Sequence, residues 1–365
     1  MKILCFIDSL DSGGAQRQLV ELATGFKEKG HEVSLLTYHN IPFFNLFLEH
    51  HNISIETIEE RNYLKRLIKV RHFIRQSDFH AVLSFLEAPN IISQMAGIPS
   101  RKWKLVVGER RINPLIKRSL KLIFYRWFHF FADFIVSNSS TNIKYVLRVN
   151  PLLSKSKCRV IYNIVDLNRW KPHPDFIFRK NLKIKLIVGA SHLPRKNAPG
   201  LIEAISLLND SELDKISIEW YGNKPNDIND YKSFESAVKK LNDLKLNNVI
   251  SFHPATNKIL KIVQDADAVG LFSFSEGMPN IICEGMACGK PVICSTVSDI
   301  VNLLSYDKNL LCDPADEHSI ASSIRYLISL DQEKLREIGN RNRKIAMENF
   351  QKDKIISDYL KLLID

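Results

Sequence analysis

The stretch LFSFSEGMPNIICEGMACGKPVICSTVSD, residues 271–299, decides how the fold of this chain is organised. Its pattern predicts an apolar strand, a polar loop with Gly and Pro, a helix, a glycine stop and a second apolar strand. Because Pro is favoured at the first position of a helix, a helix that begins near Pro279 carries Glu284 about one and a half turns inside and leaves Glu276 in the loop. A helix N-terminus attracts anions. The stretch therefore predicts a site for an anionic ligand, with two carboxylates beside it.

The residues around the predicted helix start indicate the character of that ligand. Gly277 and Asn280 suit a turn that presents backbone N–H groups, with Met278 between them. Glu284 stands in an otherwise apolar helix, where an isolated buried carboxylate costs several kcal/mol unless it is hydrogen-bonded. An ordinary surface loop with two glutamates is the alternative, and it leaves Glu284 unexplained. A diphosphate with hydroxyl groups at both ends, as in a nucleotide sugar, fits the stretch best.

The rest of the chain has the composition of a globular protein. Of its 365 residues, 45% are hydrophobic and 25% charged. No segment reaches the roughly 18 uncharged apolar residues of a membrane span, and the start MKILCFID passes directly into a strand. We therefore expect a cytoplasmic protein without a cleaved signal. The six cysteines show no C-x-x-C pair, and we expect them to be reduced core residues.

Positive charge is concentrated in the first half of the chain. Residues 1–170 contain 25 Lys and Arg against 14 Asp and Glu, whereas residues 171–365 contain 26 of each. Within residues 101–126, nine basic residues accompany a single acid, Glu109. Such a patch attracts an acidic partner. The candidates are anionic lipid, a phosphorylated acceptor and nucleic acid.

Strands and helices alternate along the whole chain. The first unit of this kind is the strand KILCFID, the loop SLDSGG, a helix and the strand VSLLTY within residues 2–38. The alternation continues to residue 163 and resumes at KLIVGA, after a segment with two prolines at 164–174. This pattern predicts an α/β protein with two Rossmann-like domains that face each other across a central cleft. We expect domains at 1–167 and 168–345, and a C-terminal helix at 346–365 that packs back on the first domain.

Two further loops are candidates for ligand binding. Gly13 and Gly14 follow the first strand, where a backbone without Cβ atoms approaches a phosphate or sugar closely, although a tight structural turn is an equal alternative. The fingerprint G-x-G-x-x-G of dinucleotide enzymes is absent from this loop. Arg195 and Lys196 follow the first strand of the second domain and suit a diphosphate. A solvated basic turn is the alternative for this pair.

Metal binding is not expected. Asp265-Ala266-Asp267 imitates a D-x-D metal motif but falls where a helix leads into a strand, so we interpret it as a turn. The histidines have no metal-ligand spacing, and His192, in the loop before Arg195, is as compatible with a polar loop position as with ligand contact.

The segment 115–134, LIKRSLKLIFYRWFHFFADF, predicts a helix with one apolar stripe and a basic face. Lys117, Arg118 and Lys121 form the basic face. Basic side chains beside exposed aromatic ones suit a helix at a lipid headgroup surface. A core helix with its basic side in water is an equal alternative.

Four motifs in this order, GGAQRQLVELATGFKEKGHEV, VIYNIVDLNRW, LPRKNAPGLIEAI and EGMPNIICEGMACGKPVICSTVSD, resemble glycosyltransferase family 4, which has the GT-B fold. The resemblance implies a retaining hexosyltransferase that uses a nucleotide diphosphate sugar without a metal or other cofactor. It also implies roles for the candidate residues: Arg195 and Lys196 hold the diphosphate, Glu284 the ribose, and Glu276 with the Gly277–Asn280 backbone the transferred sugar. Gly13 and Gly14 then line the cleft from the other domain.

The chain departs from many members of this family in its first domain. They have a histidine after the fourth strand, where this chain has SFLEAPN. The segment VVGERRINP instead resembles bacterial surface-glycan transferases, which turns attention to Glu109, Arg110 and Arg111 near an acceptor phosphate. We therefore expect a UDP-sugar donor, a lipid-linked glycan acceptor and attachment to the anionic inner face of the cytoplasmic membrane.

Two other functions remain open from the sequence. A nucleotide-sugar 2-epimerase of the same fold would need no acceptor, and a non-catalytic partner subunit would bind a nucleotide sugar or recruit a transferase. Nucleic-acid binding is not expected, because no recognition motif accompanies the basic patch.

Overall fold

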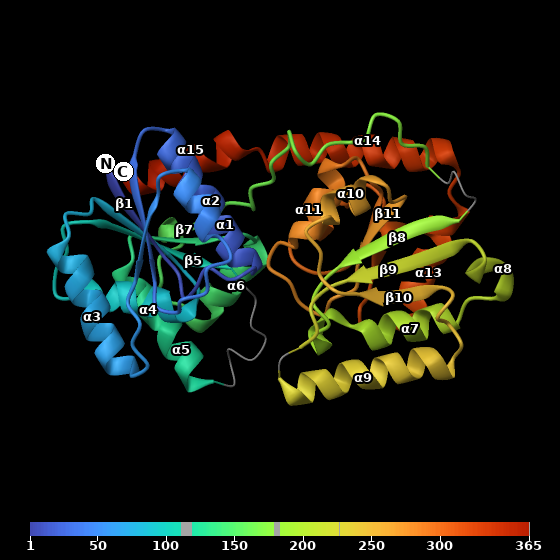
Figure 1. Ribbon diagram of the computed structural model, residues 1–365, viewed down its shortest axis with the longest axis horizontal. Helices are drawn as coiled ribbons and strands as arrows, with labels where there is room; N and C mark the ends of the chain where they lie inside the picture. The colour runs from blue at the N-terminus through green and yellow to red at the C-terminus, as the bar shows by residue number, and fades with distance from the viewer. Residues whose placement is uncertain (111–118, 179–182, 226, 365) are drawn as a thin grey trace. The chain divides into compact units, whose positions relative to one another are not determined.

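The chain forms two compact units (Figure 1). The computed structural model describes residues 1–110, 119–178, 183–225 and 227–364. The first unit consists of Met1–Ile164 and Lys352–Asp365, and the second of Val165–Gln351. The sequence placed boundaries after residues 167 and 345 instead. The difference arises because Val165 pairs with Gln351 in a parallel bridge, and because helix α14 (Gln332–Asn349) continues through residue 345.

A parallel sheet forms the centre of the first unit. Its strands among the described residues are β1 (Lys2–Phe6), β2 (Glu32–Thr37), β3 (Ser54–Thr57), β4 (Ala81–Phe85), β5 (Lys104–Glu109), β6 (Phe134–Ser137) and β7 (Cys158–Val160). Their order is β3-β2-β1-β4-β5-β6-β7, and all pairings are parallel. Because helices cover both faces, β4 is buried at every residue. The strand order reverses between β1 and β4, where such sheets bind ligands at the carboxyl ends.

Helices cover both faces of this sheet. They are α1 (Gly14–Glu28), α2 (Asn45–His50), α3 (Tyr63–Gln76), α4 (Glu87–Ala96), α5 (Leu120–Trp127), the 3-10 helix η2 (Phe128–Phe131), α6 (Ser140–Val149), η3 (Lys155–Lys157) and α15 (Lys352–Ile364). Residues of α1 and α15 share one hydrophobic core with the sheet, whereas residues of α3, α4 and α6 share the core on the other face. Helix α2 was not predicted, because its six residues are too few to show a helical period.

The helix predicted over 115–134 is shorter in its described part. Helix α5 ends at Trp127, and one 3-10 turn follows. Phe134 already belongs to β6, where it pairs with Val106 of β5. The apolar stripe, for which the sequence left an exposed and a buried position open, is exposed: Leu120 is 85% exposed and Phe124 is 53% exposed.

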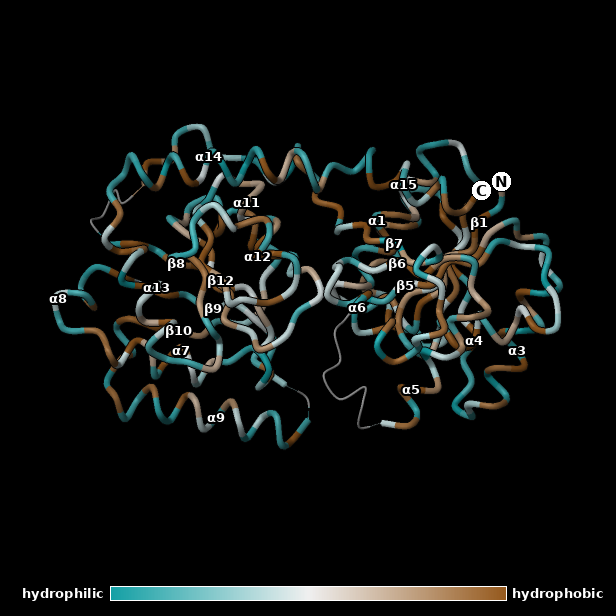
Figure 2. Tube along the Cα trace, turned by 180° about the vertical axis from the view of Figure 1, so that it is seen from behind, coloured by the Kyte–Doolittle hydropathy of each residue, from teal (hydrophilic) through white to brown (hydrophobic). Residues whose placement is uncertain are grey.

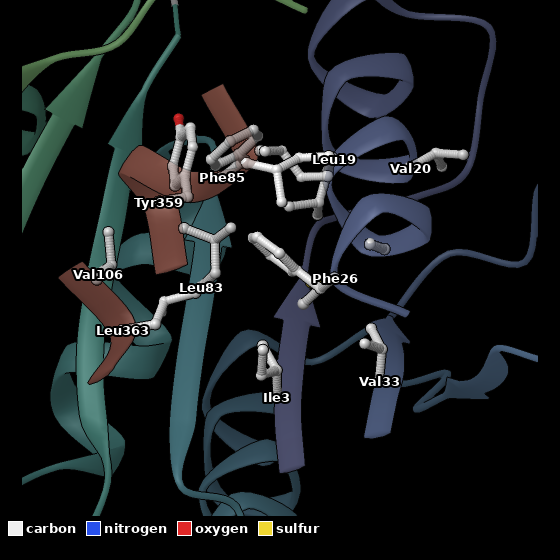
Figure 3. Close-up of a cluster of buried hydrophobic side chains, with 14 of the residues drawn as sticks. Ile3, Leu19, Val20, Phe26, Val33, Leu83, Phe85, Val106, Tyr359 and Leu363 are labelled. Atoms are coloured by element: carbon white, nitrogen blue, oxygen red, sulfur yellow. The ribbon is translucent and has the colours of Figure 1, made fainter. Parts of the chain in front are cut away.

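The C-terminal helix α15 completes the core of the first unit. Its residues Tyr359 and Leu363 lie beside Phe85 and Leu83 of β4, opposite Leu19 of α1 (Figure 3). Gly25 of α1 is close to Ile356, since a Cβ atom on Gly25 would lie 1.9 Å from the Ile356 side chain. The last helix of the chain is therefore an integral layer of the first unit.

The second unit repeats the architecture with a second parallel sheet. Its strands among the described residues are β8 (Ile184–Gly189), β9 (Ile216–Tyr221), β10 (Ile250–His253), β11 (Ala268–Leu271), β12 (Val292–Ser295) and β13 (Leu311–Cys312), in the order β10-β9-β8-β11-β12-β13. The helices are η4 (Pro194–Lys196), α7 (Ala198–Ser206), α8 (Asp210–Leu213), α9 (Ile228–Asp243), α10 (Ile259–Gln264), α11 (Asn280–Ala287), α12 (Ile300–Leu303), η5 (Lys308–Leu310), α13 (Glu317–Ser329) and α14. Figure 2 shows hydrophobic residues concentrated in the strands of each unit.

Helix α11 packs unusually close to its neighbours. A Cβ atom on Gly189 of β8 would lie 2.7 Å from Ile281, and one on Gly285 would lie 2.8 Å from Val269. On the other side, a Cβ atom on Gly339 of α14 would lie 2.1 Å from the carbonyl oxygen of Gly289. These contacts fix the position of α11, and hence of the loop before it, at the point where the strand order reverses between β8 and β11.

The cysteines are free, as expected, but one of them is not a core residue. Cys5, Cys283, Cys288, Cys294 and Cys312 are buried, whereas Cys158 is half-buried at the start of the edge strand β7. An edge strand has a neighbour on one side only, which explains the exposure.

Candidate active site

The loop between β11 and α11 is held by hydrogen bonds to its own backbone. The N–H of Phe274 donates to the carbonyl oxygen of Arg195 over 2.9 Å, which ties the loop to η4. Ser295 Oγ donates to the carbonyl oxygen of Ser273 over 2.7 Å, and Ser298 Oγ donates to that of Gly277. The loop is thus fastened to β12 and to η4 on either side of Glu276.

Lys196 and Glu276 form an ion pair. The ammonium group of Lys196 donates to Glu276 Oε1, and the two side chains are 13% and 11% exposed. Arg195 precedes Lys196 in η4 and is half-buried. Lys196 and Glu276 are 80 positions apart in the chain but lie together at the carboxyl ends of β8 and β11. Lys196 is the candidate for diphosphate contact and Glu276 the candidate for sugar contact.

Asn197 positions η4, and sequence reasoning missed it. Its backbone is left-handed, with φ 66° and ψ 42°. Its side chain accepts a hydrogen bond from the N–H of Gly200 over 3.2 Å, which caps α7, and donates to the carbonyl oxygen of Pro314 over 2.7 Å. Asn tolerates this backbone region better than most residues and is a preferred N-cap, which is the signal in LPRKNAPG.

Helix α11 begins near Pro279, as predicted. Pro279 is the N-cap, with extended backbone and no side-chain cap, and Asn280 is the first helical residue. Gly277, Met278 and Pro279 are buried. Glu284 is only 3% exposed. The helix N-terminus therefore lies next to the Lys196–Glu276 pair, with a buried carboxylate one turn further on.

Gly13 and Gly14 lie at the carboxyl end of β1 in the first unit. Gly13 is the N-cap of α1, and Gly14 is its first residue. A Cβ atom on Gly13 would lie 2.2 Å from Gln16 Oε1, so the Gln16 side chain folds over the glycine. Gln16 in turn donates from Nε2 to Asp8 Oδ1 over 3.1 Å.

Glu109 belongs to a buried charge network. Its carboxylate accepts from Arg126 over 3.0 Å, and His129 Nε2 lies 2.9 Å from the other oxygen. Arg126 also pairs with Glu87 over 3.1 Å. Burial alone would raise the pKa of Glu109, but Arg126 and His129 outweigh it and lower this pKa to about 2. The Glu109 carboxylate therefore has its hydrogen-bond partners within the fold, and it holds Arg126 in place.

Arg110 is a buried cation with neutral partners. It donates to Asn163 Oδ1 over 2.6 Å and to the hydroxyl of Tyr359 over 3.2 Å. Its guanidinium carbon lies 4.5 Å from the ring centroid of Phe85. Burial lowers the pKa of Arg110. Of the other basic candidates, Lys121 is exposed on α5, and Arg111, Lys117 and Arg118 lie outside the described residues.

A pocket of about 530 Å³ opens at the carboxyl ends of β1, β4 and β5 in the first unit. Glu109, Arg110 and Lys121, which are candidates for acceptor contact, are among the residues that line it. The other polar residues that line the pocket were not predicted from the sequence: they are Asp8, Tyr38, Tyr63, Arg66, Glu87, Ser119, Tyr125 and Arg126. These residues are far apart in the sequence, and only the strand order brings them together.

The remaining polar candidates have structural roles. Asp267 Oδ2 accepts from the N–H of Lys185 over 2.8 Å, which fits a turn between α10 and β11. The ring of His192 stacks on Phe234 at 4.4 Å between centroids, and burial lowers its pKa. Within the part of the chain that the structure describes, no group of three His, Cys, Asp or Glu side chains is arranged to hold a metal ion.

Family models match almost the entire chain. Residues 12–169 match "Glycosyltransferase Family 4", and residues 169–345 match "Glycosyl transferases group 1". A crystal structure of Anabaena Alr3699/HepE in complex with UDP and glucose superposes with a TM-score of 0.86 at 20% identity, over 100% of this chain and 99% of that one. The chain belongs to the family 4 glycosyltransferases and has the GT-B fold.

Two relatives from Campylobacter jejuni match the chain over its full length. One is N-acetylgalactosamine-N,N'-diacetylbacillosaminyl-diphospho-undecaprenol 4-alpha-N-acetylgalactosaminyltransferase, 26% identical over 100% of this chain and 99% of its own length. The other, also 26% identical, is an alpha-1,4-N-acetyl-D-galactosaminyltransferase that acts on a GalNAc-containing PP-undecaprenol glycan. The enzyme is thus a hexosyltransferase similar to transferases of bacterial glycan synthesis.

Proposed function

We propose that this glycosyltransferase is a retaining enzyme that transfers a sugar from a UDP-sugar to a hydroxyl group of a lipid-linked bacterial glycan. The main support for the proposed donor site is the ion pair between Lys196 and Glu276 at the N-terminus of α11. Cations and a helix N-terminus together suit a diphosphate. The carboxylates of Glu276, in the loop before α11, and of Glu284, within α11, suit sugar and ribose hydroxyl groups.

Each residue has a distinct role in the proposed site. Arg195 and Lys196 hold the diphosphate, Gly277–Asn280 supply backbone donors, and Glu284 accepts from the ribose. The ion pair holds Lys196 and Glu276 in place before the donor binds. When the diphosphate replaces Glu276 as the partner of Lys196, the carboxylate is released to accept hydrogen bonds from the transferred sugar.

The proposed chemistry needs charge stabilisation more than a protein nucleophile. The bond between the anomeric carbon and the β-phosphate oxygen breaks, and the electron pair stays on the phosphate. Lys196, Arg195 and the α11 N-terminus stabilise that charge as it develops. The acceptor oxygen bonds to the same face of the anomeric carbon and gives its proton to the leaving phosphate, so UDP departs and the configuration is retained.

The relatives support the choice of substrates. Both Campylobacter enzymes are named for undecaprenol diphosphate-linked acceptors, and the Anabaena protein was crystallised with UDP and with UDP-glucose. The pocket lined by Glu109 and Arg110 in the first unit is the proposed acceptor side. Gly13 and Gly14 are proposed to approach the donor through their backbone.

We further propose peripheral attachment to the cytoplasmic face of the membrane through α5. None of the described helices is long and apolar enough to cross a bilayer. On α5, Leu120, Phe124 and Trp127 are exposed, while Lys121 beside them carries positive charge. Apolar and aromatic side chains next to a cation are what an interfacial helix requires. Lys121→Glu should reduce cosedimentation with anionic vesicles, and unchanged binding would refute the role of this helix.

The donor site is tested by binding and turnover together. Thermal denaturation in the presence of UDP-, GDP- and ADP-sugars should show stabilisation by a UDP-sugar above the others, because a ligand that binds the native state raises its stability. Glu276→Ala, and Arg195→Ala combined with Lys196→Ala, should each abolish transfer while the fold persists. Full activity in either folded variant would refute the assignment. Turnover of the donor without any acceptor would favour the epimerase instead.

A further inference from the structure

The pocket of the first unit is rich in cations that have no acidic partner. Arg66, Arg110 and Lys121 all line it, and none forms an ion pair with a carboxylate within the described ranges. The fourth lining cation, Arg126, is compensated by Glu109 and Glu87. The pocket wall thus carries more positive charge than its own carboxylates balance.

Arg110 is the deepest of these cations and is held by neutral groups. It is 8% exposed, and its Nε atom is buried without a hydrogen-bond partner. Asn163 and Tyr359 each accept one of its terminal N–H groups, and Phe85 lies against its face. A buried guanidinium without a counter-ion is costly unless a ligand supplies the negative charge.

Arg66 approaches the same pocket from α3. Its guanidinium carbon lies 4.1 Å from the ring centroid of Tyr38, and its Nε atom is also buried without a partner. Asp8 is the acid of this wall that makes no ion pair within the described ranges, and burial raises its pKa, so its negative charge is disfavoured there. Four cations and three carboxylates line the pocket, so its wall has an excess of positive charge and its electrostatic complement is an anion.

We propose that this pocket binds the phosphate groups of the acceptor, in the form of a sugar diphosphate ester, with Arg110 and Arg66 as its ligands. The inference rests on the proposed function, since it concerns the acceptor of that reaction. Arginine matches phosphate oxygens with two parallel donors. Tyr38, Tyr63 and Tyr125, which line the same space, provide apolar faces and hydroxyl groups for the adjoining sugar.

The C-terminal helix has a positioning role in this site. Tyr359 of α15 is 1% exposed, and its hydroxyl group fixes one arm of Arg110. Helix α15 therefore acts on the acceptor pocket through the Tyr359 hydroxyl group, although it touches neither phosphate nor sugar in the proposal. Loss of that hydroxyl should impair acceptor binding without a change in donor binding.

The test compares two acceptor analogues and one donor product. Binding of a short-chain prenyl diphosphate sugar, of the same sugar as a neutral methyl glycoside, and of UDP is measured by calorimetry on the full chain. The wild type should prefer the diphosphate ester by tenfold or more. Arg66→Gln should reduce that preference about tenfold and leave UDP affinity unchanged, because one charge-assisted contact is lost. Lys65→Gln, on the same helix but not on the pocket wall, is the matched control and should behave as the wild type.

Arg110 and Tyr359 are tested in the same way. Arg110→Lys keeps the charge but not the paired donors, and should weaken binding of the diphosphate ester. Tyr359→Phe should raise KM for the acceptor several-fold at unchanged kcat and unchanged donor KM, whereas Tyr326→Phe in the second unit should not. Equal affinity of the wild type for ester and glycoside would overturn the proposal. So would weaker binding of UDP in Arg66→Gln, which would assign the cations to the donor. Neither result would affect the donor site, which UDP binding to Lys196 variants tests separately.

Discussion

Lys290 is a buried amine whose protonation should control the stability of the second unit. It is 1% exposed, donates from Nζ to the carbonyl oxygen of Gln264 over 2.7 Å, and lies 3.1 Å from the ring centroid of Phe176. Burial lowers the pKa of Lys290 to about 7, against the opposing effect of nearby acidic groups such as Asp267. The change considered is Lys290→Met, which keeps an unbranched side chain, one atom shorter, and removes the proton-binding group.

The sign and size of the effect follow from the two pKa values. The unfolded chain binds a proton to Lys290 below about pH 10.5, whereas the folded protein does so only below about 7. Between these limits the unfolded state binds more protons, so stability rises with pH. At about 1.4 kcal/mol for each pKa unit, the penalty is roughly 4 kcal/mol at pH 7 and roughly 2 kcal/mol at pH 9.

The measurement is urea unfolding of wild type and Lys290→Met at pH 7 and pH 9, followed by fluorescence. The variant leaves the Gln264 carbonyl without its donor, which costs about 1–3 kcal/mol at every pH. The pH-dependent difference is therefore the decisive quantity: wild type should gain roughly 2 kcal/mol relative to the variant between pH 7 and pH 9. Lys258→Met, at an exposed position, is the control. Parallel pH profiles for wild type and Lys290→Met would refute the reasoning.

Three further substitutions test other parts of the structure. Glu109→Gln should destabilise the protein by about 3–5 kcal/mol at pH 7, because it breaks a buried ion pair. Since the pKa of Glu109 in the folded protein is about 2, the stability difference between wild type and variant should shrink as the pH falls towards that value. Urea unfolding at pH 7 and pH 3 measures this change. Gly339→Ala should cost about 1–3 kcal/mol, since the new Cβ atom meets the Gly289 carbonyl; a thermal melt unchanged from wild type would contradict the close packing. Asn197→Ala should lower stability by about 1 kcal/mol and also weaken UDP binding, because the cap of α7 positions Arg195; calorimetry that shows full affinity would exclude this coupling.

Most of the fold was predictable because most strands are short and apolar and are followed by a turn signal. The strand, loop, helix and strand predicted within residues 2–38 correspond to β1, α1 and β2. Errors arose where tertiary contacts override local pattern. The helix predicted to reach Phe134 ends earlier because β6 must pair with β5. For the apolar stripe on α5, the sequence left an exposed and a buried position open, and the structure has it exposed.

The two candidate sites differ in how far the sequence predicts them. Glu276, Glu284 and Lys196 lie in compact motifs whose spacing indicates strand, loop and helix, although the Lys196–Glu276 pair itself depends on the parallel order of β8 and β11. The pocket of the first unit has no such motif. Asp8 and Arg66 come from segments that look like ordinary turn and surface helix, and only the sheet order brings them to one wall.

The position of α15 in the core of the first unit also bears on how the protein is made. Residues 352–364 supply Ile355, Ile356, Tyr359 and Leu363 to a core whose other members come from the first part of the chain. During synthesis, domains generally fold in the order in which they leave the ribosome. Here the second unit, which is continuous in sequence, is complete before the first one. Until the last helix has been translated, the N-terminal sheet therefore lacks the α15 part of the cover on the face that α1 also packs against. Chaperone binding during this interval is expected at the part of the face that α15 later covers.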